Sequence, residues 1–262
     1  MSQPVICFGQ QPNGFFPKRL LIAKIDTAKR LASELGGRVV HFYHDSDHDY
    51  RETVTVLKDV EGREERLNFT QENKVQKKYS PLYAKRIPAG WQEEVRRRLP
   101  RFVRKEIGDL FASVQAQTAG DFCFQMYAKL GLFEGIEVMR SSDHAFREKA
   151  LDLTEGFADV TYEGEIVRAR WTDGKLSLHQ GGDQYLSLPD QSIEKRQKNP
   201  HRDNRFAWMQ SVIGCTHYVY GKGEAAYMDF SKYPGITFVA RDEIADEDDS
   251  WIEPLVPLPE PQ

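Results

Sequence analysis

The sequence predicts an α/β protein: a Rossmann-like, mostly parallel sheet flanked by helices, with an inserted β-hairpin and an inserted β-meander. Apolar, strand-like segments at residues 4–8 and 39–43 enclose a helical repeat of apolar residues at three- and four-residue steps. Two further apolar segments, residues 216–220 and 236–240, also break into polar residues. Because strands joined through a helix run parallel with a right-handed crossover, these strands are expected to end at one edge of the sheet.

Length and composition predict a single domain over residues 1–245 and a proline-rich, acidic tail at 246–262 with little core potential. The 36 basic and 40 acidic residues leave a net charge of −4, which gives no basic surface for nucleic acid or anionic membranes. The three cysteines lie far apart, no stretch approaches transmembrane length, and the amino terminus does not resemble a signal peptide. We therefore expect a cytoplasmic protein that binds neither nucleic acid nor membrane.

Residues 4–43 are expected to form one strand, helix, strand unit. The first strand breaks at Gly9, and a polar, turn-rich loop follows up to Gly14. Pro17 fits a first helical turn, and the apolar repeat continues until Gly36 stops the helix.

The start of this helix is expected to face the edge where the strands end, which is where open α/β sheets bind ligands. A helix amino terminus offers free N–H groups and the positive end of the helix dipole. Lys18 and Arg19 add positive charge there, so an anion such as phosphate or carboxylate is expected. The alternative is that Lys18 and Arg19 are ordinary exposed helix residues.

The insertions lie in the middle of the chain. Alternating residues at about 53–70 predict the hairpin, and a polar excursion over the surface is expected from there to Pro88. Short alternating runs separated by glycine turns predict the meander at about 157–188. Around these, the sequence predicts helices from Trp91 and after Pro100, a helix capped by Asp121 that runs to about Leu132, a strand at 135–139, a helix after Asp143, an apolar element at 206–213 and a short helix at 225–230.

Ionisable side chains crowd one strand exit. Three carboxylates and two imidazoles follow the strand at 39–43: His44, Asp45, Asp47, His48 and Asp49. Like charges this close repel, so a cation, a metal or shared protons must offset them. The alternative is a solvated polar loop. If the strands are parallel, this segment should line one cleft with the 9–14 loop and with residues 221–224.

Two motifs in the first fifty residues have a defined spacing: Gly9-Gln10-Gln11 with Lys24, and Ser46-Asp47-His48-Asp49-Tyr50. Further along the chain stand Arg205, Tyr218, Gly221, Gly223, Glu224, Tyr227 and Arg241. In this order the motifs resemble those of the cysteine-adding enzymes of bacillithiol biosynthesis (BshC), a Rossmann-like family named for cysteine ligation.

The chain also departs from that family. Ser46 stands where the family has Glu, and Lys222 replaces a proline. Ala240 stands before Arg241 where the family has Pro-Arg, and the first loop has fewer glycines. The resemblance covers nearly the whole chain but only the core of the family. The family's helical arm for dimerisation has no counterpart, so we expect no coiled-coil dimer.

The resemblance implies a ligase, or a nucleotidyl or acyl transferase, that acts on a small carboxylate, amino-acid or sugar-derived substrate with ATP or CTP and Mg²⁺. His48 is the expected general acid, because a carboxylate of Asp47 or Asp49 beside it would raise its pKa and orient it. Lys222 and Arg241 would stabilise charge on the transferring group. The substrate or nucleotide would contact Gly9, Gln10, Gln11, Lys24, Arg205, Gly221, Gly223, Glu224, Tyr227 and Arg241.

Two other functions stay open at this point. A metal-dependent hydrolase or metal-binding protein would use His44, Asp45, Asp47 and His48 as ligands. The same scaffold also suits a non-catalytic protein that binds a small molecule.

Overall fold

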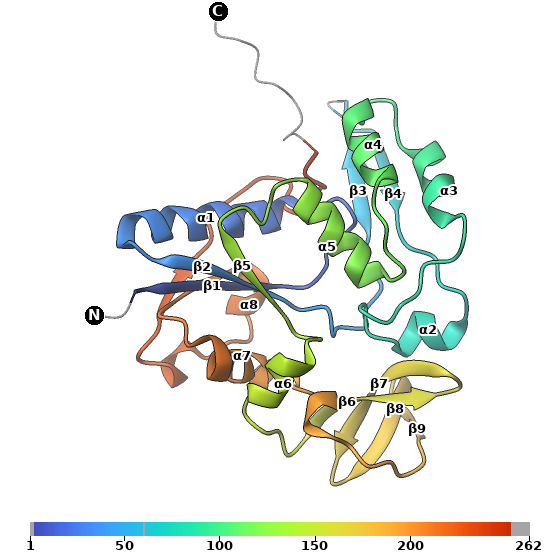
Figure 1. The fold of residues 1–262 in the computed structure, drawn as a ribbon, viewed down its shortest axis with the longest axis vertical. Coiled ribbons are helices and arrows are strands. Elements are labelled where there is room, and N and C mark those ends of the chain that lie inside the picture. Colours follow the sequence, from blue (N-terminus) through green and yellow to red (C-terminus); the bar gives the residue numbers. More distant parts are fainter. Residues whose placement is uncertain (1–2, 60, 253–262) are drawn as a thin grey trace, which may run out of the picture.

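The computed structural model describes residues 3–59 and 61–252 (Figure 1). Its central sheet has five parallel strands: β1 (Val5–Gln10), β2 (Arg38–Tyr43), β5 (Ile136–Arg140), β11 (His217–Tyr220) and β12 (Thr237–Ala240). Their spatial order is β12-β11-β1-β2-β5. Counted along the chain, this is the doubly wound order 3-2-1-4-5, which reverses between β1 and β11. The predicted α/β class and Rossmann-like parallel sheet are confirmed.

Helices cover both faces of this sheet (Figure 1). One face carries α1 (Arg19–Leu35) and α5 (Ala119–Lys129), and the other carries α6 (His144–Lys149) and α7 (Arg205–Ile213). On the second face, the ring of Phe42 lies 5.2 Å from that of Phe146 and 6.1 Å from that of Trp208. The helix after β1 and the helix before β11 therefore lie on opposite faces, which opens a crevice at the carboxyl ends of these two strands.

The segment between β2 and α5 forms a layer of its own beside the sheet. It contains β3 (Thr55–Lys58), β4 (Glu64–Leu67), α2 (Lys74–Tyr79), α3 (Trp91–Arg98) and α4 (Lys105–Ala112). β3 and β4 are antiparallel, so the predicted hairpin is confirmed. Phe15, from the loop after β1, packs against Phe69, Trp91 and Phe111 at ring distances of 5.8, 5.8 and 5.2 Å. This aromatic cluster fixes the first loop at the edge of the sheet.

The predicted meander forms a second, antiparallel sheet, seen at the lower right of Figure 1. Its strands are β6 (Gly156–Tyr162), β7 (Glu165–Thr172), β8 (Lys175–Gly181) and β9 (Gln184–Ser187), and the returning chain adds β10 (Lys198–Asn199) beside β6. Buried Arg147 ties this sheet to the end of β2. Its guanidinium donates to Asp159 Oδ2 at 2.7 Å and to Ser46 Oγ at 2.9 Å.

Three local predictions need correction. The helix α5 is capped by Thr118 rather than by Asp121, because the Thr118 hydroxyl accepts a hydrogen bond from Asp121 N at 3.3 Å. The polar stretch up to Pro88 is more than a surface excursion, since it forms α2 and buries the side chains of Gln76 and Lys85.

The third correction concerns the helix after β11. Helix α8 (Lys222–Ala225) begins before residue 225, because the Glu224 carboxylate accepts a hydrogen bond from Gly221 N at 2.9 Å and closes the first turn. Short 3₁₀ turns lie at Phe230–Lys232, Lys195–Gln197 and Arg202–Asn204.

Residues 241–252, which we call the C-terminal strap, run back across the start of α1 (Figure 1). Ser250 N donates to the Val56 carbonyl at 2.8 Å, and Trp251 N donates to the Pro17 carbonyl at 2.7 Å. Trp251 and Ile252 pack against the main core. The predicted lack of core potential is therefore wrong for residues 246–252, because an apolar pair follows their acidic run. Residues 253–262 lie outside the described part of the chain.

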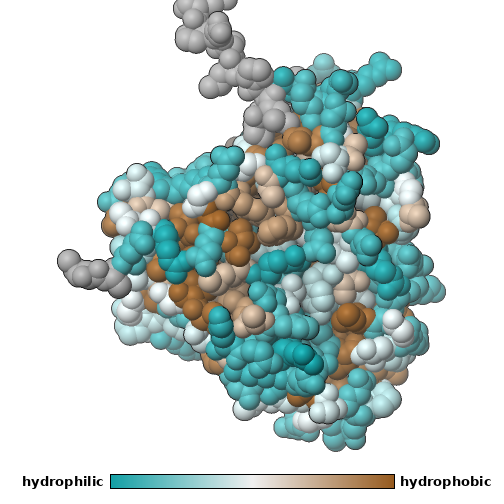
Figure 2. Space-filling view, viewed as in Figure 1, coloured by the Kyte–Doolittle hydropathy of each residue, from teal (hydrophilic) through white to brown (hydrophobic). Residues whose placement is uncertain are grey.

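The surface view shows hydrophobic side chains gathered over β5 and the adjoining parts of α1 and α5 (Figure 2). No helix in the described ranges has both the length and the apolar character needed to cross a membrane. The cysteines Cys7, Cys123 and Cys215 are all buried and free.

Candidate functional site

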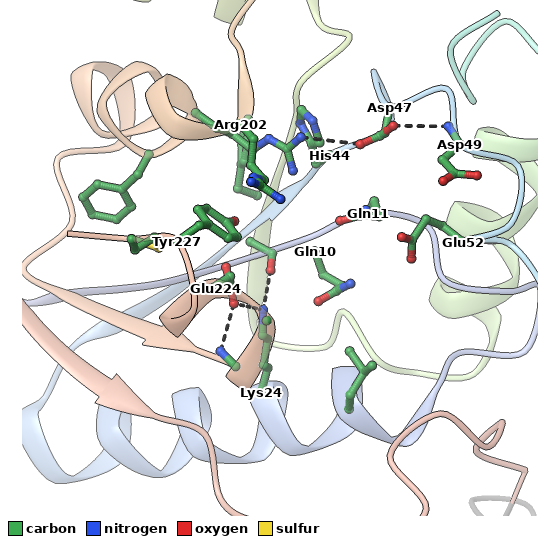
Figure 3. A pocket seen from close by; sticks show the side chains of 18 of the residues that line it. Gln10, Gln11, Lys24, His44, Asp47, Asp49, Glu52, Arg202, Glu224 and Tyr227 are labelled. Carbon is green, nitrogen blue, oxygen red and sulfur yellow. Dashed lines mark hydrogen bonds and ion pairs between the residues drawn. The ribbon is translucent and has the colours of Figure 1, made fainter. Parts of the chain in front are cut away.

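A cavity of about 790 Å³ opens where β1, β2 and β11 end (Figure 3). It lies at the point where the strand order reverses, and its volume suits a small-molecule ligand. The three segments that were expected to line one cleft all reach it. Of the residues predicted from the sequence, its wall contains Gly9, Gln10, Gln11, Lys24, His44, Asp47, His48, Asp49, Arg205, Gly221, Lys222, Gly223, Glu224, Tyr227 and Arg241.

Lys24 and Glu224 form the base of the cavity. Lys24 Nζ donates to the Gly9 carbonyl at 2.7 Å and to Glu224 Oε2 at 2.5 Å. Glu224 also accepts from the Tyr218 hydroxyl at 2.7 Å and from Gly221 N at 2.9 Å. Position 9 favours glycine, because a Cβ there would lie 2.8 Å from the Tyr218 hydroxyl and would force that side chain to move. These contacts join β1, α1 and β11 into a fixed floor.

Arginine side chains offset all three carboxylates that follow β2. Asp45 is fully buried and accepts from Arg140 Nε at 2.7 Å and from the Ser142 hydroxyl at 2.8 Å. Asp49 forms a two-point pair with Arg51, at 2.9 and 2.6 Å, and the side-chain hydrogen bonds lower the pKa of Asp49. The negative charges of these side chains are therefore balanced by arginine guanidinium groups, one of the three ways expected from the sequence.

Asp47 lies between two guanidinium groups. Nη1 of Arg168, on β7, lies 3.5 Å from Asp47 Oδ1, and Nη2 of Arg205, on α7, donates to Oδ2 at 3.4 Å. The backbone N–H groups of His48 and Asp49 donate to Oδ1 at 2.7 and 3.2 Å. Burial alone would raise the pKa of Asp47, but Arg168 and Arg205 hold it well below its usual range. The carboxylate is therefore ionised at neutral pH.

His48 lies beside Asp47 at the cavity wall, with Nδ1 3.7 Å from Asp47 Oδ1. Burial, followed by the charge of Arg168, lowers the pKa of His48 to about 4, although Asp47 acts in the opposite direction. Asp47 and Asp49 do raise this pKa, but the expected net rise is wrong, because burial and the charge of Arg168 outweigh both carboxylates. At neutral pH His48 is an uncharged imidazole, which suits a proton acceptor better than a general acid.

His44 is a second neutral imidazole on the cavity wall. It is 1% exposed, and burial and the charge of Arg205 lower its pKa well below the ordinary value. Neither ring nitrogen of His44 has a hydrogen-bond partner in the described structure. Among the predicted site residues in the described structure, only His44 has two ring nitrogens that are both buried without a hydrogen-bond partner.

The alternative set of metal ligands does not come together. Asp45 turns away from the cavity toward Arg140, whereas His44, Asp47 and His48 line the cavity wall. Within the described ranges, no group of three or more His, Cys, Asp or Glu side chains is placed to hold a metal ion.

The start of α1 is not free, contrary to the prediction. Arg19 N donates to the Asp249 carbonyl at 2.9 Å, and Leu20 N donates to the Glu247 carbonyl at 3.0 Å. The C-terminal strap thus caps the helix with its backbone, and its acidic side chains complement the positive end of the helix dipole.

Three further predicted residues differ in whether their side chains already have partners within the protein. Arg241 is buried and forms an ion pair with Glu247 of the strap, so its charge is already balanced. Lys222 lies at the rim of the cavity with 69% of its side chain exposed. The ring of Tyr227 lies 4.7 Å from the guanidinium of Arg202.

Sequence reasoning missed Glu52, Arg168 and Arg202. Glu52 lines the cavity across from the Tyr227 side (Figure 3), and burial raises its pKa. Arg168 lies on β7 between Val167 and Ala169, which face the apolar core of the meander. Strand alternation indicates that Arg168 points to the opposite face, but only the docking of the meander reveals that this face meets Asp47.

A scan of the chain against protein-family models found no match, and a search of curated proteins also found none.

Proposed function

We propose that the protein is a BshC-like ligase or transferase that acts on a small carboxylate, amino-acid or sugar-derived substrate with ATP or CTP as the activating nucleotide. The observation that carries the proposal is the convergence of the ordered motifs, from Gly9 to Arg241, in one cavity. The cavity lies at the switch point of the sheet, where doubly wound enzymes bind nucleotides and substrates.

An uncharged imidazole in the cavity supports the transfer of an activated carboxyl group to an amine. When an amine displaces phosphate or nucleotide from an activated carboxyl group, the nitrogen bonds to the carbonyl carbon, the leaving group takes the bonding electrons, and the nitrogen loses a proton. His48, with a pKa of about 4, is an uncharged base that can accept that proton.

A nucleotide would bring Mg²⁺ with it. This ion keeps several water ligands and needs only one or two protein carboxylates beside the phosphates. Glu52 lines the cavity and is the carboxylate that we expect to supply such a ligand.

The test is nucleotide binding and turnover by the purified full chain. Calorimetric titration with ATP and CTP measures binding, and release of phosphate or diphosphate in the presence of amino acids, small carboxylates and malyl sugars measures turnover. We expect one nucleotide to bind and to be consumed only with an acceptor. A protein that binds and consumes neither nucleotide would contradict the proposal and favour a small-molecule-binding role for the same scaffold.

A further inference from the structure

We propose that the anionic group of the ligand, a carboxylate or a phosphate, binds at the end of β2 between His44 and Arg205, and not at the amino terminus of α1. The inference rests on the proposed function only for the identity of the molecule that carries the anion. Both positions border the same cavity, since Leu20 of α1 lines it as well.

At the usual phosphate position of a doubly wound fold, five backbone N–H groups already donate to other groups of the protein. In the loop after β1, the N–H groups of Asn13 and Phe15 donate to hydroxyl groups of neighbouring elements at 3.1 and 3.0 Å. Lys18 N donates to Asn13 Oδ1 at 3.3 Å, and the N–H groups of Arg19 and Leu20 donate to strap carbonyls. An anion at this position would have to break these hydrogen bonds.

The end of β2 has the opposite character. Both ring nitrogens of His44 and Nε of Arg205 are buried without a hydrogen-bond partner in the described structure. Both side chains line the cavity, and His44 is 1% exposed. Because buried polar groups in folded proteins nearly always have partners, unpartnered groups of this kind indicate a place for a bound group.

Charge leads to the same position. Arg168 and Arg205 share the single carboxylate of Asp47 at 3.5 and 3.4 Å, whereas charge-assisted hydrogen bonds between such groups measure about 2.7–2.9 Å. These three groups together carry one excess positive charge in a largely buried setting, which is unfavourable unless an anion balances it. Arg168 is not part of the cavity wall, so it acts as a positioning residue behind Asp47, and Arg205 contacts the anion.

Calorimetric titration of the full chain with inorganic phosphate, malonate and ADP tests the inference. Arg205→Gln and Lys18→Ala each remove one positive charge, the first at the end of β2 and the second at the start of α1. We expect Arg205→Gln to weaken binding of the tightest probe by at least about tenfold, and Lys18→Ala to change it by less than about twofold. His44→Phe, which keeps the ring beside Phe42, should also weaken binding.

Competition between the probes identifies the source of the anion. ADP that displaces phosphate indicates a nucleotide phosphate, and malonate that binds without competition from ADP indicates a substrate carboxylate. Thermal unfolding of each variant confirms that it folds, and Arg205→Lys should restore part of the affinity. Loss of binding in Lys18→Ala with unchanged binding in Arg205→Gln would overturn the inference, as would a wild-type protein that binds none of the probes. Anion binding can be measured without turnover. If Arg205→Gln weakens anion binding and Lys18→Ala does not, a negative ligase assay would refute only the proposed function.

Discussion

The two sides of the cavity differ in how their polar groups are satisfied. At the start of α1, the N–H groups of Arg19 and Leu20 donate to the carbonyls of the C-terminal strap. At the end of β2, the buried nitrogen atoms of His44 have no partner, and two guanidinium groups share Asp47. The doubly wound sheet thus determines where a ligand binds, but it does not determine which element binds the charge of that ligand.

Both differences originate outside the parallel sheet. The strap covers α1 with backbone carbonyls, whereas the meander brings Arg168 to Asp47. The strap occupies the backbone donors of α1 that could bind an anion, whereas the meander supplies positive charge for the proposed anion site at the end of β2. Substitutions on the two sides of the cavity should therefore have different effects on stability, turnover and anion binding.

Asp47→Asn should lower the free energy of unfolding by about 3 kcal/mol, because it leaves two largely buried guanidinium groups without their counter-charge. Urea unfolding measures the change. The matched control is Asp49→Asn, since Asp49 pairs with the exposed Arg51 and should cost less than about 1 kcal/mol. If the two substitutions lowered the free energy of unfolding equally, Arg168 and Arg205 would not depend on Asp47 as a buried counter-charge.

His48→Ala should reduce turnover by at least about a hundredfold, because it removes the neutral base beside Asp47. Steady-state kinetics under the ligase assay give the ratio, and circular dichroism confirms the fold. Lys18→Ala, at the other side of the cavity, is the control and should keep turnover within about twofold. A His48→Ala variant with unchanged turnover would remove this residue from the chemistry.

The stability of the protein should fall between pH 7 and pH 5, because the buried histidines near the end of β2 resist protonation. Burial lowers the pKa of His41 from 6.5 to about 3. The unfolded chain therefore takes up a proton as the pH falls through 6.5, while the native chain does not, which costs about 2 kcal/mol at pH 5 for His41 alone. Carboxylates with lowered pKa lose their contribution only below about pH 4.

His41→Phe provides the control for this pH dependence. The ring of His41 stacks on Phe8 at 4.5 Å, and a phenyl ring keeps that contact without titrating. Urea unfolding of the variant should show a smaller loss of stability from pH 7 to pH 5. The same loss in both proteins would assign the acid sensitivity to other groups.

Ser250→Ala should lower the free energy of unfolding by about 1 kcal/mol, because the Ser250 hydroxyl accepts a hydrogen bond from Val56 N at 3.0 Å. Affinity for phosphate should stay within about twofold of wild type, since the strap is a structural cap. Clearly tighter phosphate binding by this variant would show instead that the strap competes with the anion for the start of α1.

The convergence of the site could be predicted because the exits of parallel strands share one edge of the sheet. Gly9 is the second-last residue of β1, His48 and Gly221 follow β2 and β11, and all three line the cavity. The fold class followed from the same strand and helix pattern. Local hydrogen-bond preferences, in contrast, misplaced the cap of α5, because Thr118 and Asp121 are both good capping residues.

The charge balance of the site could not be predicted, because it depends on how the inserted segments dock. Arg168 reaches Asp47 because the meander docks against the end of β2, where Arg147 contacts both Asp159 and Ser46. The pKa of His48 therefore depends on a residue whose position no local pattern reports. The strap presents a similar case, since an acidic run predicts a solvated tail until the partners of Ser250 and Trp251 are known.

A crystal structure of the wild-type protein with bound phosphate or ADP would show directly where the anion binds. We expect an anion within hydrogen-bond distance of Arg205 Nε and of a ring nitrogen of His44, with the C-terminal strap still docked on α1. An anion on the N–H groups of Arg19 and Leu20, with the strap displaced, would contradict this expectation.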